Sequence, residues 1–261
     1  MDILIPVIIF GIIGLLIGVL LSVASKIFSV TKDDRIDLVL ENLPGANCGG
    51  CGYAGCSACA EAIVAGKADV NVCPVNGKEK SIKIATIMGS KVKETKETAA
   101  FVNCSGDNCS AKRKYLFDGT KTCKDVYALK GGDKECEFSC LGYGDCVNVC
   151  KFGAITIADG IANIDKEKCT SCKMCVNTCP KKVIEILPKN IKVYVKCSSK
   201  DKGVLVKDKC KVGCIGCSIC AKNCPQDAIT ITENLAHIDY DKCVGCLVCA
   251  EKCPKKIIKT V

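Results

Sequence analysis

The sequence predicts an α+β chain in which one long apolar helix precedes a series of small cysteine-rich modules. Three observations lead to this prediction: residues 3–25 contain no charged side chain, the 261 residues include 26 cysteines, and the cysteine pattern of residues 140–179 recurs 74 positions later. So many cysteines indicate either a disulfide framework or metal-bound thiolates. Many successive cysteines are separated by only two or three residues, which is too close for a typical disulfide framework. We therefore expect reduced thiolates that bind metal.

The first element is the uncharged, almost wholly apolar run over residues 3–25. As a helix that rises 1.5 Å per residue, about 21 core residues would span about 31 Å, the thickness of a bilayer core. A cleaved signal peptide is the alternative, but an acidic residue stands where a basic cluster is usual, and the run is long for such a peptide. Because Lys26, Lys32 and Arg35 follow the run, the positive-inside rule leaves the bulk of the chain in the cytoplasm. We therefore expect residues 1–30 to form a single-pass transmembrane anchor in the cell (inner) membrane.

The first cysteine-rich module, over residues 31–77, has the spacing C-x2-C-x4-C-x16-C. Three thiolates on one loop can cap one face of a [4Fe–4S] cubane, and a distant fourth can close the site. Zinc is the alternative metal, but a zinc site normally takes two well-separated pairs of ligands. Cys59 is expected to be a spare thiol packed in a small core. The predicted ligands of this first cluster are Cys48, Cys51, Cys56 and Cys73.

After a lysine-rich linker with extra cysteines, over residues 78–122, the chain contains an internal repeat. The sequence between the cysteine runs agrees in both copies, as in AITI at 154–157 and 228–231. The spacing C-x2-C-x2-C-x3-C is typical of bacterial-type ferredoxin domains with two [4Fe–4S] clusters, in which the fourth cysteine of each run ligates the other cluster. We therefore expect two tandem domains of this type, over residues 123–190 and 191–261.

This crossed pattern assigns ligands to three clusters directly and places the two clusters of one domain close together, as electron transfer requires. The ligands predicted for the third cluster are Cys150, Cys169, Cys172 and Cys175. Those predicted for the fourth are Cys214, Cys217, Cys220 and Cys253. Those predicted for the fifth are Cys224, Cys243, Cys246 and Cys249.

The second cluster departs from the pattern, because Tyr143 stands where the other repeat has Cys217. Tyrosine is not a usual ligand of such clusters. Three regular ligands remain, Cys140, Cys146 and Cys179, and we predict that Cys136 supplies the fourth. A [3Fe–4S] centre without a fourth ligand is the alternative.

Five cysteines lie outside these five sites. The 74-residue offset relates Cys123 to Cys197, and it also relates Cys136 to Cys210. That regularity suggests a sixth cluster with four of the five as ligands, so five or six [4Fe–4S] clusters are expected; the pattern leaves the set of ligands open. The five cysteines are Cys104, Cys109, Cys123, Cys197 and Cys210.

The order of these parts resembles the B subunit of the Rnf complex, the membrane-bound, ion-translocating ferredoxin:NAD oxidoreductase. The resemblance rests on the apolar helix, the sequence NCGGCGYAGC at residues 47–56 and the ferredoxin cysteine runs, and it covers essentially the whole chain. Two ferredoxin domains make the chain similar to the longer clostridial type. The resemblance implies an electron-relay subunit of an oxidoreductase complex, with soluble ferredoxin as electron donor and other Rnf-type membrane subunits as acceptors.

Other features limit the possible functions. No G-x-G-x-x-G follows a predicted strand and no P-loop is present, so nothing indicates nucleotide binding. No acid, base or nucleophile stands out, so we expect no catalytic side chains beyond the cluster ligands and no nucleic acid as partner. The formal charge of +9 would be nearly cancelled by five clusters of about −2 each. The alternatives to a relay are a membrane-tethered polyferredoxin that reduces a regulatory iron–sulfur protein, and a zinc-binding interaction module.

Overall fold

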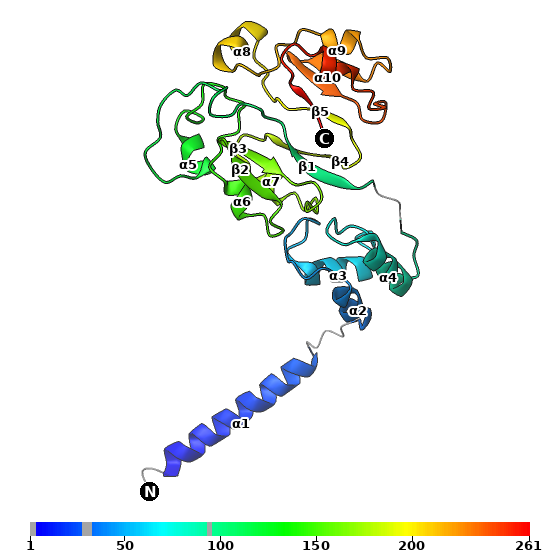
Figure 1. Cartoon of the computed structure of the whole chain (residues 1–261). Helices are drawn as coiled ribbons and strands as arrows, with labels where there is room; N and C mark the ends of the chain where they lie inside the picture. Colours follow the sequence, from blue (N-terminus) through cyan, green and yellow to red (C-terminus); the bar gives the residue numbers. More distant parts are fainter. Residues whose placement is uncertain (1–3, 28–32, 93–95) are drawn as a thin grey trace.

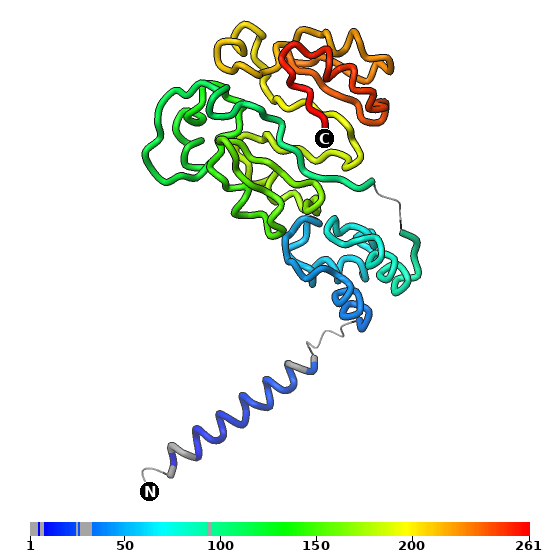
Figure 2. Tube along the Cα trace, viewed as in Figure 1, coloured from blue at the N-terminus to red at the C-terminus, as the bar shows by residue number. Residues whose placement is uncertain are grey.

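The structure is a computed structural model that describes residues 4–27, 33–92 and 96–261. Figure 1 shows its parts in the order of the sequence: a long helix, a small helical module and two α+β units. The trace in Figure 2 leads from the blue helix through the cyan module and the green unit to the unit that runs from yellow to red. We refer to residues 33–92 as the module, to residues 96–190 as unit 1 and to residues 191–261 as unit 2.

The first helix, α1 (Leu4–Ile27), is apolar, and its large side chains are exposed, among them Phe10, Leu15 and Leu20. The prediction of a transmembrane helix over residues 3–25 is nevertheless corrected here: within the described residues, no helix is both long and apolar enough to cross a membrane. The fold class of the described chain is therefore α+β, with no membrane-spanning helix in it. Residues 1–3 and 28–30 of the predicted anchor lie outside the described residues.

Three helices form the module: α2 (Arg35–Glu41), α3 (Cys56–Val64) and α4 (Lys78–Met88). Each helix has apolar residues on one face, and Val39, Ile63 and Ile84 are fully buried where these faces meet. The α4 helix ends at Gly89, whose φ of 61° lies in the left-handed region that glycine adopts without strain. The packed helices hold the cysteine-rich loop that runs into α3.

Unit 1 contains two antiparallel strand pairs and three short helices. The strands β2 (Ile155–Ala158) and β3 (Ile161–Ile164) form a hairpin, and β1 (Thr98–Val102) pairs with β4 (Ile184–Pro188). The helices are α5 (Cys123–Ala128), α6 (Asp145–Asn148) and α7 (Met174–Thr178). The strand β1 lies inside the stretch 78–122 that the sequence predicts as a linker, so residues 98–102 of that stretch belong to a sheet of unit 1.

Unit 2 repeats this arrangement. The hairpin consists of β6 (Ile229–Thr232) and β7 (Leu235–Ile238), and β5 (Val193–Val195) pairs with β8 (Ile258–Thr260). The helices are α8 (Gly203–Lys209), α9 (Ile219–Lys222) and α10 (Val248–Lys252). In both units the core combines strand residues with cysteines, so the apolar side chains surround the thiols.

Backbone contacts join the three parts. In the module, Gly50 lies so close to unit 1 that a Cβ atom on it would be 2.6 Å from the carbonyl oxygen of Cys172. The two units share a β-bridge between Ala111 and Cys210, which is flanked by hydrogen bonds from Lys112 N–H to the carbonyl oxygen of Lys209 (3.0 Å) and from Lys211 N–H to that of Ser110 (2.9 Å). The segment of unit 1 that follows β1 is therefore part of the interface with unit 2.

Candidate metal centres

In the module, the four predicted ligands lie near one another, because the thiols of Cys51, Cys56 and Cys73 all raise the pKa of Cys59, and those of Cys48 and Cys51 raise the pKa of Cys73. The loop is shaped by Asn47, whose side-chain oxygen accepts a hydrogen bond from Cys56 N–H (2.8 Å), and by Gly49 and Gly52, which have φ values of 71° and 88°. Such positive φ values suit glycine and let the backbone fold back on itself. We refer to Cys48, Cys51, Cys56 and Cys73 as quartet 1.

Cys59 lies directly behind quartet 1, with only 1% of its surface exposed. Burial raises the pKa of its thiol to about 12, and the neighbouring thiols of Cys51, Cys73 and Cys56 act in the same direction. The structure thus places a fifth sulfur next to quartet 1, on the side of the apolar core that contains Val39.

We predict that replacing Cys73 with alanine removes the cluster of quartet 1, whereas Cys59→Ala retains it. The first change deletes the ligand that closes the site and is expected to remove about four irons per chain. The second leaves a small cavity and is expected to lower the free energy of unfolding by about 1 kcal/mol. Iron and acid-labile sulfide analysis of the two variants measures the difference. Equal iron loss in both would make Cys59 a ligand and contradict the prediction.

Quartets 3 and 5 line small cavities at equivalent places in the two units. Each combines three cysteines from the second cysteine run of its unit with the last cysteine of the first run, as the crossed pattern predicts. The cavity in unit 1 is lined by Cys150, Cys169, Cys172 and Cys175, which form quartet 3. The cavity in unit 2 is lined by Cys224, Cys243, Cys246 and Cys249, which form quartet 5. Ala100 N–H donates a hydrogen bond of 3.3 Å to Cys169 Sγ, so β1 also supports quartet 3.

Quartet 4 consists of Cys214, Cys217, Cys220 and Cys253. Burial raises the pKa of the Cys220 thiol, and the other three thiols of the set raise it further, which places all four near one another. Cys217 is exposed, and so is Cys246 of quartet 5. Unit 2 therefore brings the edges of two cysteine quartets to its surface.

In the structure, the cysteine that lies beside Cys140, Cys146 and Cys179 is Cys123, whereas Cys136, the predicted fourth ligand, lines a different cavity. One cavity in unit 1 is lined by Cys123, Cys140, Cys146 and Cys179, which we call quartet 2. Burial raises the pKa of Cys146 to about 12, and the thiols of Cys140, Cys123 and Cys179 add to this effect. Cys123 begins α5, where its N–H donates to a carboxylate oxygen of Asp145 (2.9 Å) in α6. This contact holds α5 at the place that the missing cysteine would occupy.

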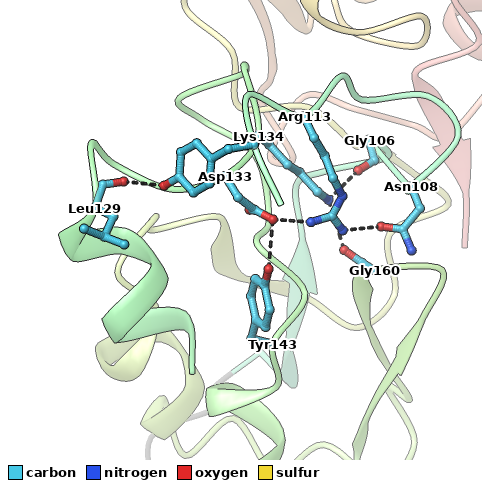
Figure 3. Close-up of polar contacts among 9 residues, drawn as sticks. Gly106, Asn108, Arg113, Leu129, Asp133, Lys134, Tyr143 and Gly160 are labelled. Carbon is cyan, nitrogen blue, oxygen red and sulfur yellow. Dashed lines mark hydrogen bonds and ion pairs between the residues drawn. The ribbon is translucent and has the colours of Figure 1, made fainter. Parts of the chain in front are cut away.

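Tyr143 takes no part in quartet 2. Its hydroxyl donates a hydrogen bond of 2.8 Å to the buried carboxylate of Asp133, and its ring packs edge-on against Phe117 with 6.3 Å between the centroids. Figure 3 shows the Tyr143 side chain directed at Asp133. The exchange of a cysteine for tyrosine is thus compensated by Cys123, which shares an apolar cluster with Tyr143.

Four further cysteines form a sixth group between the two units, which we call the bridging quartet. A cavity there is lined by Cys104, Cys136, Cys197 and Cys210. Burial raises the pKa of Cys136 to about 11 and that of Cys197 to about 12. Cys109, by contrast, is exposed and lines none of the four cysteine-lined cavities described above.

Each unit contributes an equivalent pair to the bridging quartet. Cys104 Sγ accepts hydrogen bonds from the N–H groups of Gly106 and Cys140, each 3.4 Å long. Cys197 Sγ accepts the matching bonds from Ser199 (3.5 Å) and Cys214 (3.3 Å). Cys104 is therefore the structural counterpart of Cys197. Cys123 and Cys197 are 74 residues apart in the sequence but do not occupy equivalent places in the two units.

The residues present fit [4Fe–4S] clusters. Four separate cavities are each lined by four cysteine sulfurs, the donor set that such clusters take. Among the described residues, no group of histidine, cysteine or acidic side chains is arranged to hold a single metal ion. Backbone N–H groups donate hydrogen bonds to several of the sulfurs. Such hydrogen bonds are usual around bound clusters and tune the reduction potentials of the clusters. Because burial raises the pKa of these thiols, binding of iron must displace protons from them. The chemistry that a bound cluster supplies is one-electron transfer.

Comparison with known families agrees with this assignment. Residues 43–75 match the family described as "Putative Fe-S cluster", and residues 139–183 and 213–257 each match the "4Fe-4S dicluster domain". The folds, the cysteine quartets and these matches together define the class of protein: an iron–sulfur protein that transfers electrons through multiple [4Fe–4S] clusters.

Three relatives are similar over most of this chain. The B subunit of the Na+-translocating ferredoxin:NAD+ oxidoreductase complex of Acetobacterium woodii is 46% identical over 241 residues, which are 92% of this chain and 72% of the relative. The B subunit of the ion-translocating oxidoreductase complex of Methanosarcina acetivorans is 44% identical over 88% of this chain and 87% of the relative. The B subunit of the proton-translocating ferredoxin:NAD+ oxidoreductase complex of Clostridium ljungdahlii is 39% identical over 87% and 81%.

The chain belongs to the family of B subunits of ion-translocating ferredoxin:NAD+ oxidoreductase (Rnf) complexes. It is thus a subunit of an oxidoreductase complex, and the family predicted from the cysteine module and the ferredoxin runs is confirmed.

Proposed function

We propose that this chain is the electron-relay subunit of a membrane-bound, ion-translocating ferredoxin:NAD oxidoreductase. In this role it accepts electrons from reduced ferredoxin and passes them to membrane subunits of the complex. The observation that carries the proposal is an unbroken row of six cysteine quartets, each close to the next. The order along the row is quartet 5, quartet 4, the bridging quartet, quartet 2, quartet 3 and quartet 1.

Within each unit, the two quartets of the crossed arrangement lie next to each other. In unit 2, the Cys220 thiol of quartet 4 is close enough to raise the pKa of Cys249 in quartet 5. In unit 1, Cys175 of quartet 3 has the same effect on Cys146 of quartet 2. This closeness supports short electron-transfer steps inside both units.

Between the units, the bridging quartet is hydrogen-bonded to both neighbours. Its Cys197 Sγ accepts a bond of 3.3 Å from the N–H of Cys214, a ligand residue of quartet 4. Its Cys104 Sγ accepts a bond of 3.4 Å from the N–H of Cys140, a ligand residue of quartet 2. The bridging quartet thus connects the two ferredoxin-like units. Of the six quartets, it is the one to which both units contribute cysteines.

The module continues the row from quartet 3. Cys48 of quartet 1 is close enough to Cys172 of quartet 3 to raise the pKa of its thiol, although burial raises it more. Lys151 of unit 1 donates a hydrogen bond of 2.8 Å to the carbonyl oxygen of Ala46, next to the cysteine loop of the module. Both contacts support electron transfer between unit 1 and the module.

We place the entry of electrons at unit 2 and their exit at the module. Exposed cysteines in quartets 4 and 5, Cys217 and Cys246, allow a soluble donor to approach both sites. At the other end, α1 presents a large exposed apolar surface, which is a common sign of a protein partner. The proposed partners are the membrane subunits of the complex, and the proposed location is the cytoplasmic face of the cell membrane.

The proposal is tested by anaerobic stopped-flow mixing of the purified full chain with reduced ferredoxin, followed by the loss of iron–sulfur absorbance. We expect the chain to be reduced by ferredoxin to nearly the extent that dithionite achieves. Reduction by dithionite but not by ferredoxin would contradict a ferredoxin-accepting role. The chain incubated with an unrelated low-potential flavoprotein serves as the control for non-specific reduction.

A further inference from the structure

The only lysine that is almost completely buried among the described residues lies between two of the cysteine quartets. Lys134 has 1% of its surface exposed. Its Nζ donates hydrogen bonds to the carbonyl oxygens of Gly106 (2.9 Å) and Gly160 (3.1 Å). Figure 3 shows its side chain reaching these two carbonyl groups from the segment that precedes Cys136.

No carboxylate of the described residues forms an ion pair with this ammonium group. The neighbouring Asp133 is fully buried, but its carboxylate is engaged by the Arg113 guanidinium and the Tyr143 hydroxyl (Figure 3). The carboxylate of Asp107 is near enough to feel the charge of Lys134, yet it accepts its own hydrogen bonds from Cys109 and Ser110 N–H. A buried charge without a counter-ion is costly, so an anionic partner is expected nearby.

The two carbonyl groups place Lys134 between quartet 2 and the bridging quartet. Gly106 lines the cavity of the bridging quartet and donates its N–H to Cys104 Sγ. Gly160 lies directly against Gly142, two residues from Cys140 of quartet 2, and leaves no room for a Cβ atom there. The Lys134 ammonium also acts on the Cys140 thiol itself, where it opposes the effect of burial on the pKa. The position of the charge is thus fixed relative to both groups of sulfurs.

No lysine of unit 2, all of whose residues the structure describes, is buried as Lys134 is. The 74-residue offset that relates Cys136 to Cys210 relates Lys134 to Asp208, which is exposed and paired with Lys112 (2.6 Å). Two lysines of unit 2, Lys196 and Lys209, also line the cavity of the bridging quartet, but both are only partly buried, and Lys209 is paired with Asp201 (2.8 Å). A residue that merely held the loops of a ferredoxin-like unit together would not be expected to change sign between the two repeats.

We propose that Lys134 is the counter-ion of the clusters in quartet 2 and the bridging quartet. Its charge raises the reduction potentials of these two clusters above those of the clusters next to them in the row. This inference deepens the proposed relay and rests on it. A cluster with its four thiolates is anionic and becomes more so when reduced, so a fixed nearby cation stabilises the reduced form. Electrons that cross from unit 2 to unit 1 would then move toward the centres near Lys134.

The test is an EPR-monitored redox titration of the full chain, purified anaerobically, with Lys134 replaced in turn by methionine, glutamine and arginine. Methionine and glutamine remove the charge, and glutamine retains donors for the carbonyl groups; arginine keeps the charge. We expect two of the centres to shift to more negative midpoint potentials in Lys134→Met and Lys134→Gln, and to return to the parent values in Lys134→Arg. Lys80→Met, an exposed position on α4, is the matched control.

Iron analysis accompanies each titration, because a neutral side chain could also weaken cluster binding. Iron loss in the two neutral variants that arginine restores supports the role of the charge. Full iron content with unchanged potentials in Lys134→Met and Lys134→Gln would overturn the inference, and so would equal iron loss in all three variants. None of these readouts uses ferredoxin, so a failure here is distinct from a failure of ferredoxin to reduce the chain.

Discussion

Replacing Cys197 with alanine is expected to remove one cluster and to interrupt electron transfer between the two ferredoxin-like units. Cys197 supplies one of the two sulfurs that unit 2 contributes to the bridging quartet, and 9% of its surface is exposed, so no solvent ligand can easily replace it. We expect a loss of about four irons per chain. Reduced ferredoxin should then reduce the two centres of unit 2 rapidly and those of unit 1 and the module at least about tenfold more slowly, which corresponds to about 1.4 kcal/mol in the barrier.

The matched control for this experiment is Cys109→Ala. Cys109 is exposed and lines none of the four cysteine-lined cavities, so its loss should change neither the iron content nor the kinetics. Stopped-flow absorbance under anaerobic conditions separates the fast and slow phases. An unchanged single phase in Cys197→Ala, together with a normal iron content, would contradict both the sixth site and its place in the row. The complementary variant Cys104→Ala, on the other side of the interface, should reproduce the result.

The regular parts of the chain could be predicted from sequence because cluster binding fixes local spacing. Within quartets 3, 4 and 5, three ligands lie on one short run, and the crossed fourth ligand follows from the repeat. The structure brings each of these sets together. Quartet 1 follows the same logic, with three ligands on one loop.

The irregular part could not be predicted, because one unit contains an insertion. Cys136 and Cys210 are 74 positions apart, but the structurally equivalent Cys104 and Cys197 are 93 apart, so unit 1 carries 19 additional residues between its two bridging cysteines. Cys123 belongs to that insertion, and its position 74 residues before Cys197 is a coincidence of numbering. The choice between Cys123 and Cys136 depends on how α5 packs against α6 through Asp145. Such a long-range contact has no signature in cysteine spacing.

Two lysines at matching positions illustrate a second limit of the sequence pattern. Lys181 and Lys255, which follow the last cysteine–proline pair of each unit, look like surface charges that could attract an acidic partner. In the structure each donates to a backbone carbonyl of its own unit, Lys181 to that of Glu137 and Lys255 to that of Lys211 (2.5 Å). Burial also lowers the pKa of Lys181, whose ammonium lies over the ring of Tyr127. Their repetition therefore reflects a shared structural contact.

The second large effect is expected at the contact between the module and unit 1, where Gly50→Ala should separate quartet 1 from quartet 3. A Cβ atom at residue 50 would lie 2.6 Å from the carbonyl oxygen of Cys172 and 3.0 Å from its Cα atom. These are backbone atoms of a loop that holds a ligand, so neither side can yield as a flexible side chain would. Overpacking of this kind costs about 1–3 kcal/mol, which would shift the docked population by roughly 5- to 150-fold.

Gly77→Ala separates this effect from a general loss of stability in the module. Gly77 precedes α4 with a φ of −62° that alanine can adopt, and no atom lies within 4 Å of the added Cβ. Both variants should retain their full iron content, because neither glycine is a ligand. In Gly50→Ala the centres of units 1 and 2 should still be reduced rapidly by ferredoxin, while the centre of quartet 1 is reduced slowly; in Gly77→Ala all should be reduced as in the parent. If quartet 1 received electrons at the parent rate in Gly50→Ala, its route would not pass through Cys172, and the module would need a separate donor. Whether residue 50 is glycine or alanine thus decides whether the row of quartets ends in unit 1 or extends to the module.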